Sequence, residues 1–203
     1  DGLPDLVLTS RATNTILIHT LGETLSESPD IVLHPTGSSF GTRIFGEVLG
    51  TDYDFNGDGF HDLAVSEIRA SIGTPHDLIF TPLGRVAVYE SPLIDGAEPD
   101  WSFYGHSGYV GKTQPLAFDI NDDGHSDLLM AADFNFSQIF INNQDGTFTN
   151  VTDPLVIIDG NGMGSAVGDY DGDGDLDWFV SSILAQGEVP PHLSSIGNRL
   201  YRN

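Results

Sequence analysis

An aspartate-rich segment of nine residues occurs three times in the chain, at residues 54–62, 119–127 and 169–177. Each copy has oxygen-bearing side chains at positions 1, 3, 5 and 9, a glycine at position 6 and an apolar stretch directly after it. Carboxylates this close repel one another, by about 1 kcal/mol in water for two charges ~4 Å apart. A hard dication offsets that repulsion, and a tight turn at the glycine brings the oxygens together around it. The repeated segment therefore predicts three Ca²⁺-binding loops.

Two other structures share part of this pattern. An EF-hand loop also opens with D-x-[DN]-x-[DN]-G, but it needs a bidentate Glu at position 12 and a helix on each side. Position 12 is Val65, Met130 and Val180 here, and the residues after each loop are typical of short strands. The remaining alternative is an Asp/Asn/Gly hairpin turn without metal, although three copies in one register favour the metal.

Each loop is expected to hold one Ca²⁺ through the side chains at positions 1, 3, 5 and 9 and the backbone carbonyl at position 7. The predicted ligands are Asp54, Asn56, Asp58, Phe60 and Asp62; Asp119, Asn121, Asp123, His125 and Asp127; and Asp169, Asp171, Asp173, Asp175 and Asp177. Asp1, Leu3 and Asp5 retain part of a fourth site. Mg²⁺ suits these loops poorly, because it requires a compact octahedron and keeps its waters.

The loops recur with a period of about 50–65 residues, and short apolar or alternating segments lie between them. These segments give four strands per unit, which is the pattern of a β-propeller blade. We predict an all-β fold of four-stranded antiparallel blades, divided as 1–39 (partial), 40–106, 107–155 and 156–203 (partial), or about three to four blades. The first unit lacks an inner strand and the last an outer one, so we expect part of a larger propeller or of an assembly that covers these edges.

A family resemblance strengthens this prediction. Phe40, Gly41 and residues 47–65 (EVLGTDYDFNGDGFHDLAV) resemble the FG-GAP repeat of integrin α-subunit propellers. Residues 143–152 (NQDGTFTNVT), 162–177 (GMGSAVGDYDGDGDLD) and 198–203 (NRLYRN) look like the related VCBS repeats of secreted propellers. The resemblance spans essentially the whole chain and implies a Ca²⁺-binding β-propeller. It leaves the function open, because the family includes adhesion receptors, lectins, domains attached to lyases and lipases, and bacterial surface proteins.

The chain is strongly acidic, with a formal net charge of −23. That charge repels nucleic acid phosphates and anionic lipid headgroups, so neither is an expected partner. No apolar stretch approaches the ~18 residues that a membrane-spanning helix needs, and membrane insertion is not expected. Because Ca²⁺ sites of millimolar affinity belong outside the cell, we expect an extracellular protein, secreted or on the cell surface.

No catalytic set can be selected from the sequence. The chain has no Cys and no G-x-S-x-G segment. His61 and His125 lie within the predicted metal loops, and the other five His residues have no repeated partner or metal-ligand spacing. We therefore expect a non-catalytic module for adhesion or ligand recognition, with a protein or glycan as its ligand. Four aromatic residues are candidates for stacking on a sugar, although Trp178 suits the core better: Trp101, Tyr104, Tyr109 and Trp178.

Two other functions remain open. The incomplete edges of the array favour self-association into a surface layer or filament. Alternatively, the array is the scaffold of a polysaccharide lyase or hydrolase, with its base on one of the long segments at residues 70–84 and 186–196. Asn135 and Asn150 each begin an N-glycosylation sequon.

Overall fold

In the computed structural model, the described residues are 5–10, 12–20, 27–35, 44–68, 84–105, 109–110, 115–133, 137–183 and 197–203. Only the backbone is described for residues 44–49, 52, 68, 109–110 and 133. Within these ranges the chain forms strands and turns without a helix, so none of them contains a helix that could cross a membrane. The prediction of an all-β fold is confirmed.

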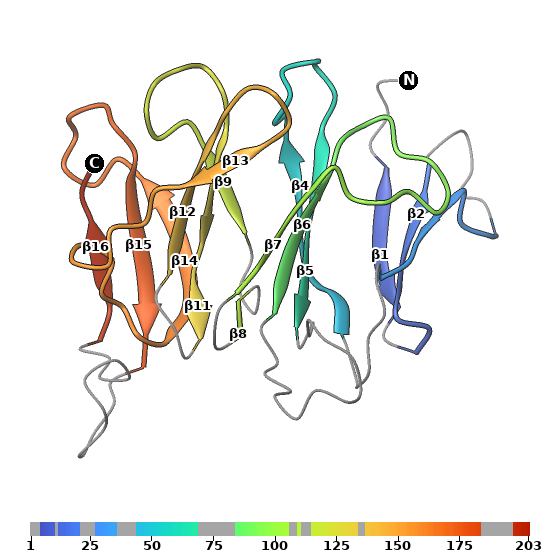
Figure 1. The fold of residues 1–203 in the computed structure, drawn as a ribbon, viewed down its shortest axis with the longest axis horizontal. Coiled ribbons are helices and arrows are strands. Elements are labelled where there is room, and N and C mark those ends of the chain that lie inside the picture. Colours follow the sequence, from blue (N-terminus) through green and yellow to red (C-terminus); the bar gives the residue numbers. More distant parts are fainter. Residues whose placement is uncertain are drawn as a thin grey trace.

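Most of the strands are short, and only β4 reaches ten residues (Figure 1). Their bounds are β1 (Leu6–Ser10), β2 (Thr15–His19), β3 (Ile31–Leu33), β4 (Ile44–Tyr53), β5 (Asp62–Ile68), β6 (Arg85–Tyr89), β7 (Trp101–Tyr104), β8 (Tyr109–Val110), β9 (Leu116–Phe118), β10 (Asp127–Met130), β11 (Ala132–Asp133), β12 (Gln138–Asn142), β13 (Phe148–Asn150), β14 (Gly162–Gly168), β15 (Asp177–Ser182) and β16 (Arg199–Tyr201).

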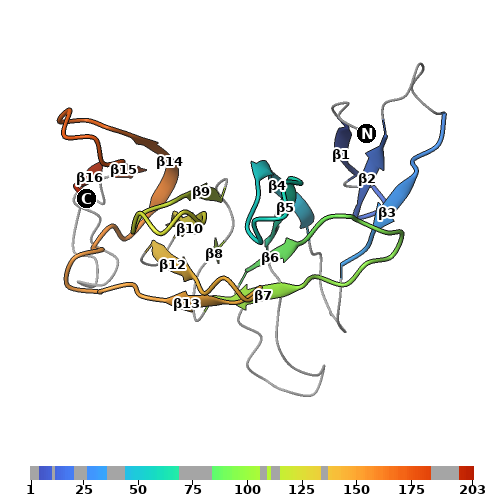
Figure 2. The ribbon, with the colours of Figure 1, turned by 90° about the horizontal axis from the view of Figure 1, so that it is seen from above.

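Four antiparallel sheets follow one another in chain order, and we number them 1 to 4. Their strand orders are β1-β2-β3, β4-β5-β6-β7, β9-β10-β12-β13 and β14-β15-β16. A separate pair, β8 with β11, was not predicted from the sequence. Seen from above, the sheets lie along an arc, with β4, β9 and β14 toward one side and β7 and β13 toward the other (Figure 2). This arrangement is propeller-like.

The core lies between successive sheets and is divided into three clusters. In β5, Leu63 and Val65 pack toward sheet 1, whereas Ala64 packs toward sheet 3. In β10, Leu128 packs toward sheet 2 and Leu129 toward sheet 4. Neighbouring residues of a strand point to opposite faces, so apolar strands with two buried faces join each sheet to both of its neighbours.

Sheet 4 approaches β11 closely at Gly162, the first residue of β14. A Cβ atom added there would lie 3.1 Å from the backbone nitrogen of Ala132 and 3.2 Å from its carbonyl oxygen. Glycine makes that backbone contact without crowding, whereas a Cβ would require Ala132 to shift by a few tenths of an ångström. The glycine-rich segment before the third loop therefore leads the chain into the first strand of sheet 4, and the contact sets how closely β14 packs.

Several predicted features lie outside the described residues. These are Asp1 and Leu3 of the partial fourth site, Asn135, residues 70–83 and residues 186–196. Asp5 is described and exposed, and Asn150 is exposed at the end of β13. The partial fourth site and the glycosylation of Asn135 and Asn150 stay predictions.

Candidate metal-binding loops

The three aspartate-rich loops occupy equivalent places in sheets 2, 3 and 4. Each joins the first strand of its sheet to the second: β4 to β5, β9 to β10 and β14 to β15. All three lie at the same edge of the molecule, the upper one in Figure 1. The repeat in the sequence therefore corresponds to a repeat in space.

The aspartate at position 1 organises each turn by accepting backbone N–H groups. Asp54 accepts from the nitrogens of Gly57 at 2.7 Å and Gly59 at 2.9 Å. Asp169 makes the equivalent bonds, to the Gly172 and Gly174 nitrogens. Asp119 accepts from the position-6 nitrogen of Gly124 in the same way, but its second bond comes from Asp123 at position 5. The turn thus holds this carboxylate at the loop centre.

Position 5 repeats in the same way. Asp58, Asp123 and Asp173 each accept the N–H of the residue two positions later, at 2.8, 2.9 and 3.1 Å. That hydrogen bond from the His125 N–H is the main reason why the pKa of Asp123 is lowered. Asp123 is therefore held as an acceptor-only carboxylate, the form that binds a cation.

The aspartate at position 9 connects its loop to the third strand of the sheet. Asp62 accepts the Phe55 N–H at 2.7 Å with Oδ2 and the Ser91 N–H at 2.8 Å with Oδ1. The same pair of bonds fixes the two equivalent carboxylates: Asp127 with the Ile120 and Asn142 nitrogens, and Asp177 with those of Tyr170 and Asn203. Position 9 is thus a structural clamp in all three loops.

These clamps are buried, with exposed fractions of 2% at Asp62, 0% at Asp127 and 1% at Asp177. Desolvation raises the pKa of Asp62 and Asp127, and their hydrogen bonds from backbone N–H groups oppose that rise. The neighbouring carboxylates at positions 1 and 5 add a smaller upward contribution to both pKa values. A bound cation would offset both the desolvation of these carboxylates and the repulsion from their neighbours.

The third loop brings its carboxylates closest together. One oxygen each from Asp169, Asp171 and Asp177 lies within 4.8 Å of the other two. Asp175, at position 7, is exposed, and repulsion from Asp173 and Asp122 raises its pKa. Oxygen ligands with this much negative charge fit a hard divalent cation, and Ca²⁺ accepts six to eight of them.

Position 3 is Asn56 in the first loop and Asn121 in the second. Each accepts the backbone N–H of position 5 through its side-chain oxygen, at 3.0 and 3.2 Å. Asn supplies a carbonyl oxygen without charge, so these two loops offer the same kind of donor set with one carboxylate fewer. In these two loops the side chains at positions 1 and 3 therefore accept the same backbone N–H, that of position 5.

Two charged residues beside the loops were not predicted. The Arg202 guanidinium lies 2.6 Å from Asp171 Oδ2 through Nε and 3.0 Å from Asp173 Oδ2 through Nη2. The Asn56 amide donates to Glu90 Oε2 at 3.4 Å. Both come from the ends of strands far from the loops in sequence, and nothing in the local sequence pattern indicates either contact.

A second unpredicted feature connects neighbouring sheets. The Asn142 side-chain amide, from sheet 3, donates to the Phe55 carbonyl in the first loop at 2.6 Å. The Asn203 amide, which follows β16 of sheet 4, donates to the Ile120 carbonyl in the second loop at 3.1 Å. The first and second loops are thereby each joined to the sheet that follows in the chain.

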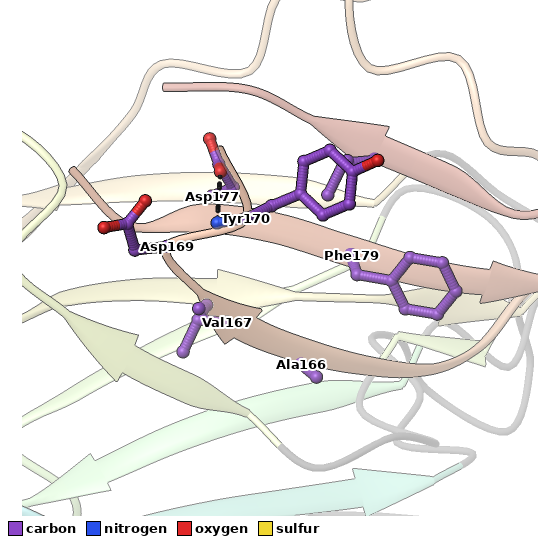
Figure 3. A pocket seen from close by; sticks show the side chains of 8 residues that line it. Ala166, Val167, Asp169, Tyr170, Asp177 and Phe179 are labelled. Atoms are coloured by element: carbon purple, nitrogen blue, oxygen red, sulfur yellow. Dashed lines mark hydrogen bonds between the residues drawn. The ribbon is translucent and has the colours of Figure 1, made fainter. Parts of the chain in front are cut away.

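A hollow of about 460 Å³ lies beside the third loop (Figure 3). Asp169 and Asp177 are on its acidic side, where the Tyr170 N–H donates to Asp177 Oδ2 at 2.9 Å. Ala166 and Phe179 lie on its apolar side. The hollow thus joins a predicted cation site to an exposed apolar surface.

Of the aromatic residues considered for sugar stacking, Trp178 is only 1% exposed and packs in the core between sheets 3 and 4, as expected. The ring centroids of Trp101 and Phe148 are 4.9 Å apart. The Arg85 guanidinium carbon lies 5.4 Å from the ring centroid of Tyr104. The side chain of Tyr109 is outside the described set. Tyr170, which was not selected from the sequence, is 76% exposed at the hollow.

Comparison with known protein families gives one match. Residues 119–180 match the family of FG-GAP-like repeats. The matched segment begins at the second loop and includes the third, so it contains the loop-and-strand unit described above. No curated protein matches the chain.

Proposed function

We propose that this chain, which carries an FG-GAP-like repeat at residues 119–180, is an extracellular calcium-binding β-propeller module that recognises a protein or glycan ligand without catalysing a reaction. The observation that carries the proposal is the threefold repetition of one hydrogen-bonded loop, together with the close approach of three carboxylates in the third copy. Each of the four larger sheets falls within one of the predicted units 1–39, 40–106, 107–155 and 156–203, which supports their interpretation as blades.

In this proposal each loop holds one Ca²⁺ through its side chains at positions 1, 3, 5 and 9 and its carbonyl at position 7. The ion supplies positive charge where buried and exposed carboxylates meet. The loops fix the order of the first two strands of each sheet and, through Asn142 and Asn203, the position of the next sheet. Calcium binding would therefore stabilise the whole array rather than single turns.

The expected location follows from the affinity of such loops. The calcium sites of extracellular modules bind in the range available outside cells, where Ca²⁺ is millimolar. The net charge of −23 suits a cation-rich medium for the same reason. Together these properties favour a secreted or surface-exposed protein.

Calcium counting tests the metal part of the proposal. Isothermal titration of metal-free protein should give three binding equivalents, and Asp171→Asn should weaken one of them while leaving the others unchanged. Ser102→Ala, on an exposed residue in the middle of β7, is a matched control and should retain all three. A heat signal no larger than that of buffer would overturn the proposed calcium sites.

Ligand recognition is proposed at the hollow beside the third loop. A cation there would accept hydroxyl or carboxylate oxygens of a ligand, and the exposed Tyr170 ring offers a face for a sugar. Binding on a glycan array should require Ca²⁺ and should be lost in Tyr170→Ala. Absence of glycan binding in Ca²⁺ would leave a protein ligand as the proposed partner, and failure to capture an extracellular protein as well would contradict the recognition function.

A second candidate function, self-assembly, is favoured by one exposed face. The paired residues Gly50, Ala64 and Val88 in sheet 2 are buried against sheet 3. The equivalent row in sheet 4 is Ala166, Phe179 and Leu200, with Phe179 38% and Leu200 42% exposed. In this alternative the face packs against a sheet from a second copy.

Sedimentation velocity distinguishes the two candidates. If the row in sheet 4 is an assembly surface, the protein should self-associate as its concentration rises, and Phe179→Glu should keep it monomeric. Tyr170→Glu is a control at an exposed residue outside the row. Monomeric wild-type protein at all concentrations would remove the assembly function and leave the recognition module.

A further inference from the structure

We infer that the residue opposite the position-9 aspartate in the strand register sets the cation affinity of that loop: Arg202 weakens binding in the third loop, and Glu90 strengthens it in the first. This inference rests on the proposed calcium sites and adds a determinant outside the nine-residue loops. It predicts three sites of different affinity although their loops have the same local geometry.

The register of the strands defines this position. Leu63 pairs with Tyr89, Leu128 with Phe140 and Trp178 with Tyr201. The next residue along each third strand therefore stands opposite the position-9 aspartate of its own loop. These residues are Glu90 in sheet 2, Ile141 in sheet 3 and Arg202 in sheet 4. In an antiparallel pair, opposed side chains share one face and lie close together.

Arg202 uses this position to contact two predicted ligands. Its guanidinium pairs with Asp171 and Asp173, at loop positions 3 and 5. The contact with Arg202 is the main reason why the pKa of Asp173 is lowered. A Ca²⁺ that takes both carboxylates must displace the guanidinium or accept a positive charge beside it, and either event costs binding free energy.

The composition of the third loop explains why the positive charge of Arg202 stabilises that loop when no metal is bound. All five odd positions of residues 169–177 are Asp, whereas each of the other loops has three Asp at these positions. Like charges at this separation destabilise the folded loop. Arg202 offsets part of that repulsion, so the third loop keeps its conformation at low Ca²⁺ and exchanges one cation for another as Ca²⁺ rises.

The first loop has the opposite arrangement. Glu90 reaches Asn56, at position 3, and so places a fourth carboxylate beside a loop with three. A Cβ atom at Gly146 would lie 3.1 Å from Glu90 Oε1, so the carboxylate is also confined by the next sheet. A confined carboxylate at the edge of a cation site raises affinity through its charge and loses little freedom on binding. Ile141 leaves the second loop without either effect.

Terbium luminescence should report most strongly on the third loop. Position 2 of the third loop is Tyr170, and Trp178 directly follows that loop. The corresponding residues are Phe55 and Leu63 for the first loop and Ile120 and Leu128 for the second. Excitation of Trp178 should therefore sensitise Tb³⁺ in the third loop, and added Ca²⁺ should displace it. Arg202→Gln should increase the Ca²⁺ affinity measured in this way about tenfold, and Arg202→Lys by less.

Two further variants serve as reciprocal controls, with affinities from calcium titration. Glu90→Gln should weaken the first site several-fold, and Ile141→Arg should weaken the second by transferring the arginine contact to it. Arg202→Gln should also lower the melting temperature in EDTA but not in Ca²⁺, because the guanidinium is displaced when metal is bound. Arg202 is exposed, so the variant should fold.

The outcomes separate this inference from the proposed function. Three calcium equivalents in the wild type with an unchanged third-loop affinity in Arg202→Gln would overturn the inference and leave the calcium sites standing. Weaker binding in that variant would also overturn it, because Arg202 would then assist the site. No calcium binding in any variant would overturn both.

Discussion

At the scale of single residues, the loops depend on backbone conformations that few residues adopt. Position 4 has φ values of 75° at Gly57, 57° at Asp122 and 77° at Gly172. Position 6 is Gly in all three loops, with φ between 88° and 102°. Asp and Asn tolerate the left-handed region near φ +57°, but other side chains are strained there, and at larger φ the requirement for glycine is stricter.

This difference predicts unequal effects of substitution at positions 4 and 6. Gly174→Ala should lower the free energy of unfolding by about 1–2 kcal/mol, the cost of a left-handed residue with a Cβ. Gly172→Asn should cost clearly less, because Asp122 already occupies the equivalent position. Urea denaturation in EDTA measures both variants without a contribution from metal. Equal costs at the two positions would contradict this assignment of the turn.

Asp159 is a buried titratable residue away from the loops. It is 0% exposed and accepts hydrogen bonds from the Tyr201 hydroxyl at 2.6 Å and from the Ser137 hydroxyl. Burial is the largest influence on the Asp159 pKa and raises it, while the two hydroxyls oppose the rise. The folded protein therefore binds this proton more tightly than the unfolded chain does.

The sign of the resulting pH dependence can be tested. Because the folded-state pKa of Asp159 is raised, its stabilising contribution is complete below the ordinary value of 3.8 and is lost as pH rises through the raised pKa. The stability of wild-type protein relative to Asp159→Asn should thus fall between acidic and neutral pH. Thermal melts of both proteins in EDTA at several pH values give this difference. A difference that grows with pH would refute the assignment.

At the scale of elements, the sheets are joined by polar contacts as well as by apolar packing. Asn142 follows the same pattern as Asn203: its backbone N–H donates to the position-9 aspartate of its own loop, and its side chain reaches the preceding loop. Each of these asparagines therefore connects the third strand of its sheet to two loops, that of its own sheet and that of the preceding sheet. Ser91, in the equivalent place of sheet 2, donates its hydroxyl to the His61 carbonyl of its own loop instead.

The two asparagines should differ in their contribution to stability. Asn142 is 3% exposed, and Asn142→Ala would leave the buried Phe55 carbonyl without its side-chain donor, at a cost of about 1–3 kcal/mol. Asn203 is exposed, so water can replace its amide and Asn203→Ala should cost less. Equilibrium unfolding in urea compares them. A larger loss for Asn203→Ala would show that burial does not determine the contribution of these contacts.

At the scale of the whole molecule, the repeat explains both the fold and its exposed surfaces. Sheets 2 and 3, which have a neighbour on each side, are buried on both faces. The row in sheet 4 that contains Phe179 and Leu200 has no facing sheet among the described residues and is partly exposed. The strands were predictable because apolar alternation and loop spacing are local properties of the sequence. The order within each sheet largely follows the chain, because strands that are neighbours in sequence usually pair.

Other features could not be predicted, because they depend on contacts between segments distant in sequence. The opposition of Arg202 to the third loop requires the strand register, and the reach of Asn142 to Phe55 requires the packing of two sheets. The exposure of Tyr170 depends on the direction of its loop, which its place in the repeat does not indicate. The calcium ligands themselves were proposed from their spacing alone.

The central claim is that the aspartate-rich loops bind calcium and that binding stabilises the protein. If a loop binds with a dissociation constant of ~10 μM, ~1 mM Ca²⁺ stabilises the fold by about 2.7 kcal/mol per site. Thermal unfolding should therefore occur at a substantially lower temperature in EDTA than in Ca²⁺, and Asp173→Ala should remove the part of that difference due to the third loop. Melting curves that coincide with and without EDTA would contradict the claim and identify the loops as metal-free turns.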